Sequence, residues 1–259
     1  MHPTLFQLGG RAFPSYGVLV TAGYVLAFGV ILWLSGKRGL LRAEMAAYLL
    51  FLALATAIGA KLYFFVGAAL RDIPYYSRQP AELLRNLKGG GAFFGGMIAG
   101  LLFSVWYLRR FHLGFWKVAD CVAPGAALGH AVGRVGCFLA GCCYGRPTTL
   151  PWGVKFPFLE GPVHPTQLYE AGLDLVNALI LFQLFRRKGR EGSVFLAYLF
   201  NYSLIRFLLE YLRGDPARAY IFRGASPLAS LSGPQLVSLA GLTASIVLLV
   251  LRSRTPGHA

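Results

Sequence analysis

Seven long apolar runs constrain this chain more than any other feature of its sequence. They cover residues 16–34, 45–69, 92–108, 118–140, 167–185, 194–212 and 235–251. Apolar runs of about 17 to 25 residues are typical of helices that cross a lipid bilayer. Only 14% of the residues are charged, against about 25% in soluble domains. We therefore predict an all-α integral membrane protein with seven transmembrane helices.

The segments between these runs are short, which favours one helical domain over residues 1–259. The longer loops, 70–91, 141–166 and 213–234, are expected on the outer side of the membrane. The first residues, MHPTLFQLGGRAFP, lack the basic segment and the cleavage site of a signal peptide. We expect the first apolar run to stay in the membrane.

The distribution of basic residues predicts the orientation. The net charge is +15, but the basic residues sit in clusters between apolar runs, which argues against a nucleic-acid partner. Twelve lie in the short loops and the C-terminal tail, and ten are spread over the longer loops and the N-terminus. The denser side is cytoplasmic by the positive-inside rule, so the N-terminus faces outward and the C-terminus inward. The dense clusters are Lys37, Arg38 and Arg42; Arg109, Arg110 and Lys117; Arg186, Arg187, Lys188 and Arg190; and Arg252 and Arg254.

Three basic residues fall inside the apolar runs, and a charge in the bilayer costs several kcal/mol unless it is paired or hydrated. They are Lys61, Arg134 and Arg206. Four acids accompany them: Asp120, Glu170, Asp174 and Glu210. Given the predicted orientation, all except Asp120 lie in the outer half of the bundle. We expect a polar cluster there, and intramembrane charges of this kind indicate a functional site.

Helical spacing supports this cluster, because residues three and four apart share one face of a helix. Arg206 and Glu210 also fit a structural i,i+4 ion pair, and this alternative stays open. Arg134 has no acid three or four residues away, which favours a functional role. The three polar stripes are His130, Arg134, Cys137 and Gly141; Gln167, Glu170, Asp174 and Asn177; and Arg206, Glu210 and Arg213.

Residues 133–148, GRVGCFLAGCCYGRPT, resemble the signature of the bacterial prolipoprotein diacylglyceryl transferases, which runs close to GRIGNFINGELYGRPT. The resemblance covers most of the chain. HPTQLYE at residues 164–170 resembles the family's HPSQLYE. The other matching stretches are Ser15-Tyr16-Gly17, Gly95-Gly96-Met97, and Ile205-Arg206-Phe207 with Glu210 and Arg213.

This resemblance implies a transferase. The diacylglyceryl group of phosphatidylglycerol would pass to the lipobox cysteine thiol of a prolipoprotein, and glycerol phosphate would leave. The resemblance also implies a multi-pass protein of the bacterial inner membrane, with its active site facing the outer side. The expected partners are the anionic phospholipid, the prolipoprotein signal peptide and the bilayer. We predict no cofactor and no metal.

Arg134 and Arg206 are the expected phosphate ligands, because guanidinium groups stay charged and bind phosphate through forked donors. Tyr16 and Glu170 are expected to orient a head-group hydroxyl or an arginine. The glycines at 95, 96, 133, 136, 141 and 145 fit close approach to lipid or, equally, small-residue helix packing. The remaining expected substrate-binding residues are Lys61, Cys143, Tyr144, Arg146, His164, Gln167, Tyr169, Glu210 and Arg213.

The chain departs from the family pattern on the acceptor side. Phe94 replaces the histidine of the family's HGGL motif, and Cys137 replaces the asparagine of GRIGN. Ala140 and Cys142 stand at the asparagine and glutamate of NGE. At two of these positions, a cysteine thus replaces a polar residue that can form hydrogen bonds.

Three hypotheses follow from this departure. In the first, the transferase activates the acceptor thiol with His130 or His164. In the second, a paralogue serves another acceptor, with Cys137, Cys142 or Cys143 as covalent nucleophile. In the third, the bundle is a thiol–disulfide or metal-handling protein.

The cysteines themselves allow several states. A disulfide from Cys137 to Cys142 or Cys143 fits an oxidising outer face, and simple packing of small thiols fits as well. The three cysteines with His130 match zinc spacing only weakly. We expect Cys121 in the core.

Two further residues have structural interpretations. His164 also fits a role as the cap of the fifth predicted helix. Trp152 fits an aromatic belt at the membrane interface.

Overall fold

The computed structural model describes residues 2–71, 73–78, 93–187, 189–214, 220–222 and 230–254. Outside the described residues lie most of the predicted loop 70–91, position 92, Lys188 and parts of the loop 213–234. The chain forms two compact units, one of Met1–Leu34 with Trp116–Ala259 and the other of Ser35–Phe115. The single domain predicted over residues 1–259 stays a prediction.

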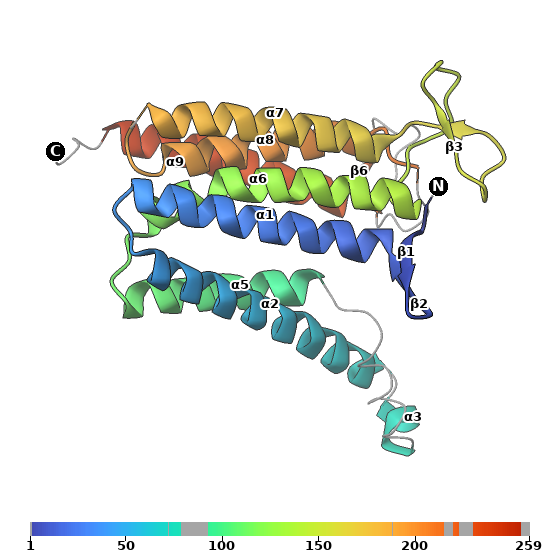
Figure 1. The fold of residues 1–259 in the computed structure, drawn as a ribbon, viewed down its shortest axis with the longest axis horizontal. Coiled ribbons are helices and arrows are strands. Elements are labelled where there is room, and N and C mark those ends of the chain that lie inside the picture. Colours follow the sequence, from blue (N-terminus) through green and yellow to red (C-terminus); the bar gives the residue numbers. More distant parts are fainter. Residues whose placement is uncertain are drawn as a thin grey trace. The chain divides into compact units, whose positions relative to one another are not determined.

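Long helices occupy the positions of all seven apolar runs (Figure 1). Most continue past the apolar run into its basic flanks, whereas α8 ends two residues before its predicted end. They are α1 (Ser15–Lys37), α2 (Arg42–Arg71), α5 (Phe93–Arg110), α6 (Phe115–Ala140), α7 (Thr166–Arg186), α8 (Ser193–Glu210) and α9 (Gly233–Arg254).

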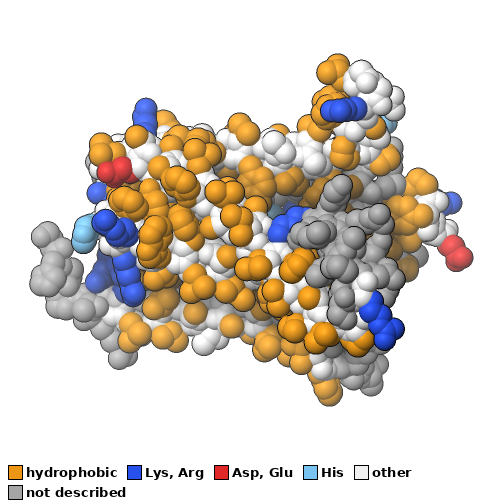
Figure 2. Space-filling model, turned by 90° about the horizontal axis from the view of Figure 1, so that it is seen from below, with side chains coloured by type: hydrophobic (Ala, Val, Ile, Leu, Met, Phe, Trp, Pro, Cys, Tyr) orange, Lys and Arg blue, Asp and Glu red, His pale blue; other side chains and the backbone are white. Residues whose placement is uncertain are grey.

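Among the described residues, six of these helices are long and apolar enough to cross a membrane. The exception is α5, whose 18 residues include Arg109 and Arg110 at their end. The face in Figure 2 is covered largely by hydrophobic side chains, as lipid-facing helices require. The fold is that of a helical membrane protein, and the seventh crossing stays a prediction.

Short two-stranded antiparallel sheets were not predicted. β1 (Thr4–Leu8) pairs with β2 (Arg11–Pro14), β3 (Val154–Lys155) with β4 (Pro162–Val163), and β5 (Tyr220–Phe222) with β6 (Leu231–Ser232). A short helix, α3 (Ile73–Arg78), lies within the predicted loop 70–91. The first hairpin turns at Gly9 and Gly10, whose φ angles of 55° and 76° suit a two-residue turn that only glycine adopts easily.

In the unit of residues 35–115, α2 packs on α5 through glycines. A Cβ atom on Gly95 would lie 2.2 Å from Cβ of Tyr63 and 2.5 Å from the carbonyl oxygen of Gly59. Gly96 is likewise buried against α2, at Thr56. The small-residue packing interpretation of these glycines is therefore confirmed.

In the other unit, α1 packs on α6, and α7, α8 and α9 pack in sequence. A Cβ on Gly23 of α1 would lie 2.6 Å from the carbonyl oxygen of Gly129 on α6, so the two backbones touch. The amide of Asn201 on α8 donates a 2.9 Å hydrogen bond to Oδ1 of Asn177 on α7. Gly241 of α9 lies against the side chain of Ser203 on α8, where a Cβ atom would not fit.

Asp120, the acid predicted apart from the polar cluster, has a structural role. Its Oδ2 accepts a 2.7 Å hydrogen bond from the backbone N–H of Gly192, and its Oδ1 a 2.8 Å bond from that of Phe195. Gly192 is the N-cap of α8. Asp120 thus satisfies the free N–H groups at the start of α8 from a neighbouring helix.

Candidate active site

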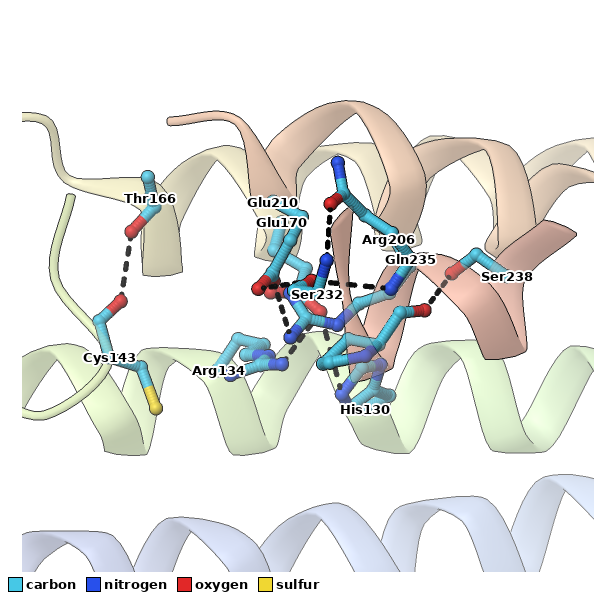
Figure 3. Close-up of polar contacts among 11 residues, drawn as sticks. His130, Arg134, Cys143, Thr166, Glu170, Arg206, Glu210, Ser232, Gln235 and Ser238 are labelled. Atoms are coloured by element: carbon cyan, nitrogen blue, oxygen red, sulfur yellow. Dashed lines mark hydrogen bonds and ion pairs between the residues drawn. The ribbon is translucent and has the colours of Figure 1, made fainter. Parts of the chain in front are cut away.

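The predicted polar cluster is present where the C-terminal part of α6, the first turns of α7, the last turns of α8 and the start of α9 come together (Figure 3). The four predicted polar residues of α7 are all buried, with exposed fractions of 3% or less. They are Gln167, Glu170, Asp174 and Asn177.

Arg134 finds its partner on another helix. Its Nη2 donates a 2.7 Å hydrogen bond to Oε1 of Glu170, and the two side chains are 12% and 3% exposed. Glu170 therefore accepts a hydrogen bond from the arginine. One turn earlier on α6, Nδ1 of His130 lies 2.9 Å from Oδ2 of Asp174, and Nε2 lies 4.0 Å from Oε1 of Glu170.

Arg206 pairs along its own helix, as the i,i+4 alternative predicted. Its Nη2 lies 3.0 Å from Oε2 of Glu210, and the side chains are 15% and 1% exposed. The other carboxylate oxygen of Glu210 accepts a 3.0 Å hydrogen bond from Ser232 Oγ. Figure 3 shows Arg134 and Arg206 directed into one group with these carboxylates.

Ser232 and Gln235 were missed by the sequence reasoning, although a signal was present. Ser232-x-x-Gln235 is a capping box at the start of α9. The Ser232 N–H donates to Gln235 Oε1 at 3.0 Å, and the Gln235 N–H donates to Ser232 Oγ at 3.4 Å. The cap of α9 therefore also positions Glu210.

Two tyrosines of α8 were missed as well. The ring of Tyr202 stacks on that of Tyr198 at 5.8 Å and meets the His130 ring edge-on at 5.3 Å. Tyr202 also lies within electrostatic reach of both Arg134 and Arg206. Its spacing from Arg206 is four, so it extends the polar stripe of α8 by one turn.

Each arginine keeps a donor that its carboxylate does not use. Within the described part of the chain, Arg134 Nε and Arg206 Nη1 are buried and have no hydrogen-bond partner. A buried donor without an acceptor costs about 1–3 kcal/mol, more when it is charged. A phosphate oxygen would satisfy such donors with charge-assisted hydrogen bonds.

At the end of α6, a tight turn brings the thiols of Cys142 and Cys143 close to that of Cys137 in the last turn of the helix. Gly141 has a φ of 76°, and the Cys142 N–H bonds the Cys137 carbonyl at 3.1 Å, which is a Schellman C-cap. Gln167 Nε2 then donates to the Cys142 carbonyl at 2.7 Å, and Thr166 Oγ1 to the Cys143 carbonyl at 2.9 Å. The start of α7 thus fixes the backbone of both cysteines.

All four cysteines of the described chain are free, so the predicted disulfides are not formed. The sulfur atoms of Cys137, Cys142 and Cys143 lie within 4.8 Å of one another. His130 groups with Glu170 and Asp174 and not with the thiols, so it does not belong with the three cysteines whose spacing, together with His130, weakly matched a zinc site. Cys121 is fully buried, as predicted.

The environment of Cys143 favours its thiolate. Hydrogen bonds from the thiols of Cys137 and Cys142 lower the pKa of Cys143 well below its ordinary value, and the positive charges of Arg213 and Arg134 act in the same direction. The φ of Cys143 is 61°, which is uncommon for a residue other than glycine. The turn therefore holds Cys143 in a specific, strained conformation.

The loop of residues 141–166, which we call the signature loop, is held at the start of α7 and at the end of α8 by backbone hydrogen bonds. The Gly145 N–H donates to the His164 carbonyl at 2.9 Å, and the Arg146 N–H donates to the Leu212 carbonyl at 2.8 Å. Arg146 Nε donates to the Arg213 carbonyl at 3.2 Å. These bonds bring Gly145, Arg146, His164 and Arg213 together.

The aromatic residues near this loop pack or pair with one another. Trp152 Nε1 donates to the Tyr169 hydroxyl at 2.8 Å, and His164 Nδ1 lies 3.4 Å from the same oxygen. The side chain of His164 makes no capping bond to α7, so that prediction is wrong. Tyr144 packs on Phe156 and Phe158.

Five other predicted residues lie on α1, just after α6 or in the unit of residues 35–115. The backbone of Tyr16 touches Gly136 of α6, beside Cys137, and its side chain is 47% exposed. Gly141 lies one residue beyond the end of α6. Lys61, which is exposed, and Gly95 and Gly96 belong to the unit of residues 35–115.

Comparison with known proteins gives a consistent result. A family model described as prolipoprotein diacylglyceryl transferase matches residues 3–251. The chain is 35% identical over 250 residues to the phosphatidylglycerol–prolipoprotein diacylglyceryl transferase of Geobacter sulfurreducens, covering 95% of this chain and 94% of that protein. Proteins of the same name from Clostridium tetani (34% over 221 residues, 83% and 87% covered) and Glaesserella parasuis (33% over 267 residues, 96% and 91% covered) are also similar.

Proposed function

This chain belongs to the prolipoprotein diacylglyceryl transferase family, and we propose that it transfers the diacylglyceryl group of phosphatidylglycerol to the lipobox cysteine thiol of a prolipoprotein. In this reaction the thiol loses its proton and the sulfur forms a bond to the glyceryl carbon. The bond from that carbon to the phosphate oxygen breaks, and its electron pair leaves with glycerol phosphate. The names of the relatives favour this hypothesis, and nothing favours a different acceptor or a redox protein.

One observation carries the proposal: two buried arginines from separate helices converge, and each retains a donor without a partner among the described residues. Arg134 and Arg206 bind the phosphate of the donor lipid and stabilise the negative charge that builds up as the bond to carbon breaks. Each already pairs with one carboxylate, so each arginine is held in place before the lipid arrives. Glu170 and Glu210 therefore orient the arginines, and the phosphate takes the remaining N–H groups.

His130 is the base in this proposal. Asp174 lies 2.9 Å from its Nδ1 and fixes the tautomer in which Nε2 is free to accept a proton. The ring is 30% exposed, so an acceptor thiol can approach it. It supplies a base that this chain needs, since Phe94 stands where the family pattern has histidine.

Residues of the signature turn and loop hold the head group and the acceptor segment in this proposal. Tyr16 and Gln167 lie beside the thiols, and the signature loop lies on the other side of the proposed substrate site. We also propose substrate contacts for Lys61, Gly95 and Gly96, which lie in the unit of residues 35–115. The residues proposed for this role are Tyr144, Gly145, Arg146 and His164 of the loop, Tyr169 of α7 and Arg213 just after α8.

We further propose that the protein crosses the bacterial cytoplasmic membrane seven times, with its N-terminus outside and its C-terminus inside. The basic clusters in the short loops support this orientation. The active site then faces the outer side, because Arg134 and Glu210 lie toward the helix ends that join the long loops.

The test is a transfer assay with purified protein, phosphatidylglycerol vesicles and a lipobox peptide. We expect release of glycerol phosphate and a mass gain of one diacylglyceryl group on the peptide cysteine. A peptide with serine in place of that cysteine is the control for acceptor chemistry. Bound phosphatidylglycerol without any release of glycerol phosphate would rule out the proposed reaction.

A further inference from the structure

The three thiols at and just beyond the end of α6 take no part in bond formation or proton transfer in the reaction proposed above. Cys137 is buried with 8% of its surface exposed, Cys143 is partly buried and Cys142 is exposed. Their sulfur atoms lie within 4.8 Å of one another, from positions five and one apart in the sequence. We infer that Cys137, Cys142 and Cys143 form a three-thiolate binding site for a soft divalent metal ion of the zinc class.

The spacing of the sulfur atoms suits such an ion. Zinc–thiolate bonds of about 2.3 Å in tetrahedral geometry place two sulfur ligands about 3.8 Å apart. The sulfurs already lie close to that separation, so small rotations of the side chains complete the site. Thiolates select zinc-like ions over magnesium and calcium, which require oxygen ligands.

The backbone of the site is fixed before any ion binds. The Cys142 N–H bonds the Cys137 carbonyl, Gln167 holds the Cys142 carbonyl and Thr166 holds the Cys143 carbonyl. Figure 3 shows the last of these bonds, with the Cys143 sulfur directed toward α6. Both α7 residues are buried, at 2% and 1% exposure. Hydrogen bonds of this kind, made to the residues that carry the ligands, orient the ligands and reduce the entropy lost on binding.

Charge and access also fit. Arg134 and Arg213 act electrostatically on Cys143, and their positive charges offset the excess negative charge of three thiolates around a divalent ion. Cys142 is exposed and gives an entry path to the buried Cys137. Three protein ligands leave the fourth tetrahedral position for water or an incoming thiol.

The test is metal titration of the full-length protein in detergent, purified with a non-thiol reductant. We expect one Zn²⁺ per chain and, with Co²⁺, the near-ultraviolet charge-transfer absorption of thiolate ligation. Mg²⁺ should not compete. No lipid or peptide is present, so the outcome is independent of the transferase activity.

Variants give the decisive comparison. Cys142→Ser removes one ligand at an exposed position, so folding should be retained, and thermal unfolding checks this. Changing a residue that only hydrogen-bonds a ligand costs about 10–100-fold in metal affinity, so loss of a direct ligand should cost about 100-fold or more. Cys121→Ala, at the buried cysteine of α6 that lies outside the thiol group, is the matched control and should bind as the unmodified protein does. Equal Zn²⁺ affinity in Cys142→Ser, or no thiolate band with Co²⁺, would overturn the inference.

Discussion

Arg134 on α6 donates a 2.7 Å hydrogen bond to Glu170 on α7, and both side chains are almost fully removed from the surface. Removing one member of a buried ion pair costs about 3–5 kcal/mol, because the other charge is left without compensation. We expect Glu170→Ala to lower the stability of the protein by about this amount. Glu170→Gln keeps an acceptor oxygen and should cost less. Thermal unfolding in detergent measures both.

The matched control is Glu191→Gln. Its side chain is exposed, and only its backbone carbonyl is used, by Arg252. This control should unfold at the temperature of the unmodified protein. If Glu170→Ala were as stable as Glu191→Gln, the ion pair would contribute nothing to the fold.

The two arginines of the site should not tolerate lysine. Lysine keeps the charge but loses the planar fork with which a guanidinium holds a carboxylate and a phosphate at once. We expect Arg134→Lys and Arg206→Lys each to lower the rate of glycerol phosphate release by about 100-fold or more, as for loss of a donor to a developing oxyanion.

Arg252→Lys is the control for this pair. Arg252 is an arginine of α9 that donates to the Glu191 carbonyl and stacks on Trp116, near the start of α6. Its replacement should leave the transfer rate within about twofold, since it belongs to no part of the site. Full activity of Arg134→Lys and Arg206→Lys would remove the proposed phosphate ligands.

The helices were predictable from the sequence because each is a long apolar run, and membrane helices satisfy their hydrogen bonds within the run. The polar face of α7 was predictable too, since charged and amide side chains at spacings of three and four avoid lipid. The short hairpins were missed, because strands such as Val154–Lys155 have two residues and carry no periodic signal. The pair of Gly9 and Gly10 was the exception that a turn rule would have detected.

The partners within the site were harder to predict. Nothing in the sequence says that Arg134 pairs with Glu170 or that His130 pairs with Asp174, because such pairs depend on how α6 and α7 are rotated against each other. The i,i+4 pair of Arg206 and Glu210 was predictable because it is local. The alternative that His164 caps α7 is wrong, because the N-cap is Pro165 and the His164 side chain lies near the Tyr169 hydroxyl instead.

Gly145 is the residue of the signature loop least able to accept a side chain. A Cβ atom there would lie 2.5 Å from Cβ of His164 and 2.9 Å from the Leu212 carbonyl oxygen. We expect Gly145→Ala to destabilise the protein by about 1–3 kcal/mol, as overpacking does, and to lower activity by displacing Arg146. Gly161→Ala is the control in the same loop, because its Cβ would meet nothing within 4 Å. Thermal unfolding and the transfer assay should separate the two variants.

Ser232 connects the cap of α9 to the arginine site, because its hydroxyl donates to Glu210 and accepts from Gln235. Loss of an N-cap costs about 0.5–2 kcal/mol, and Glu210 then loses one of its hydrogen bonds. We expect Ser232→Ala to reduce both stability and transfer rate. Ser238→Ala, on the same helix, removes only a bond to the Pro234 carbonyl and should affect neither strongly. Equal transfer rates in the two variants would mean that Glu210 holds Arg206 without Ser232.

Asp120 offers the opposite case, a buried acid with a structural role only. Its two carboxylate oxygens accept from the N–H groups of Gly192 and Phe195, so Asp120→Ala leaves two donors at the start of α8 without an acceptor. Each such donor costs about 1–3 kcal/mol, so the unfolding temperature should fall clearly. Asp120→Asn keeps one acceptor oxygen and should recover part of that loss. In both variants the transfer rate of the folded fraction should stay close to that of the unmodified protein, because Asp120 lies near the start of α6 and Arg134 near its end. A selective loss of activity in Asp120→Asn, with stability intact, would show instead that Asp120 takes part in the reaction.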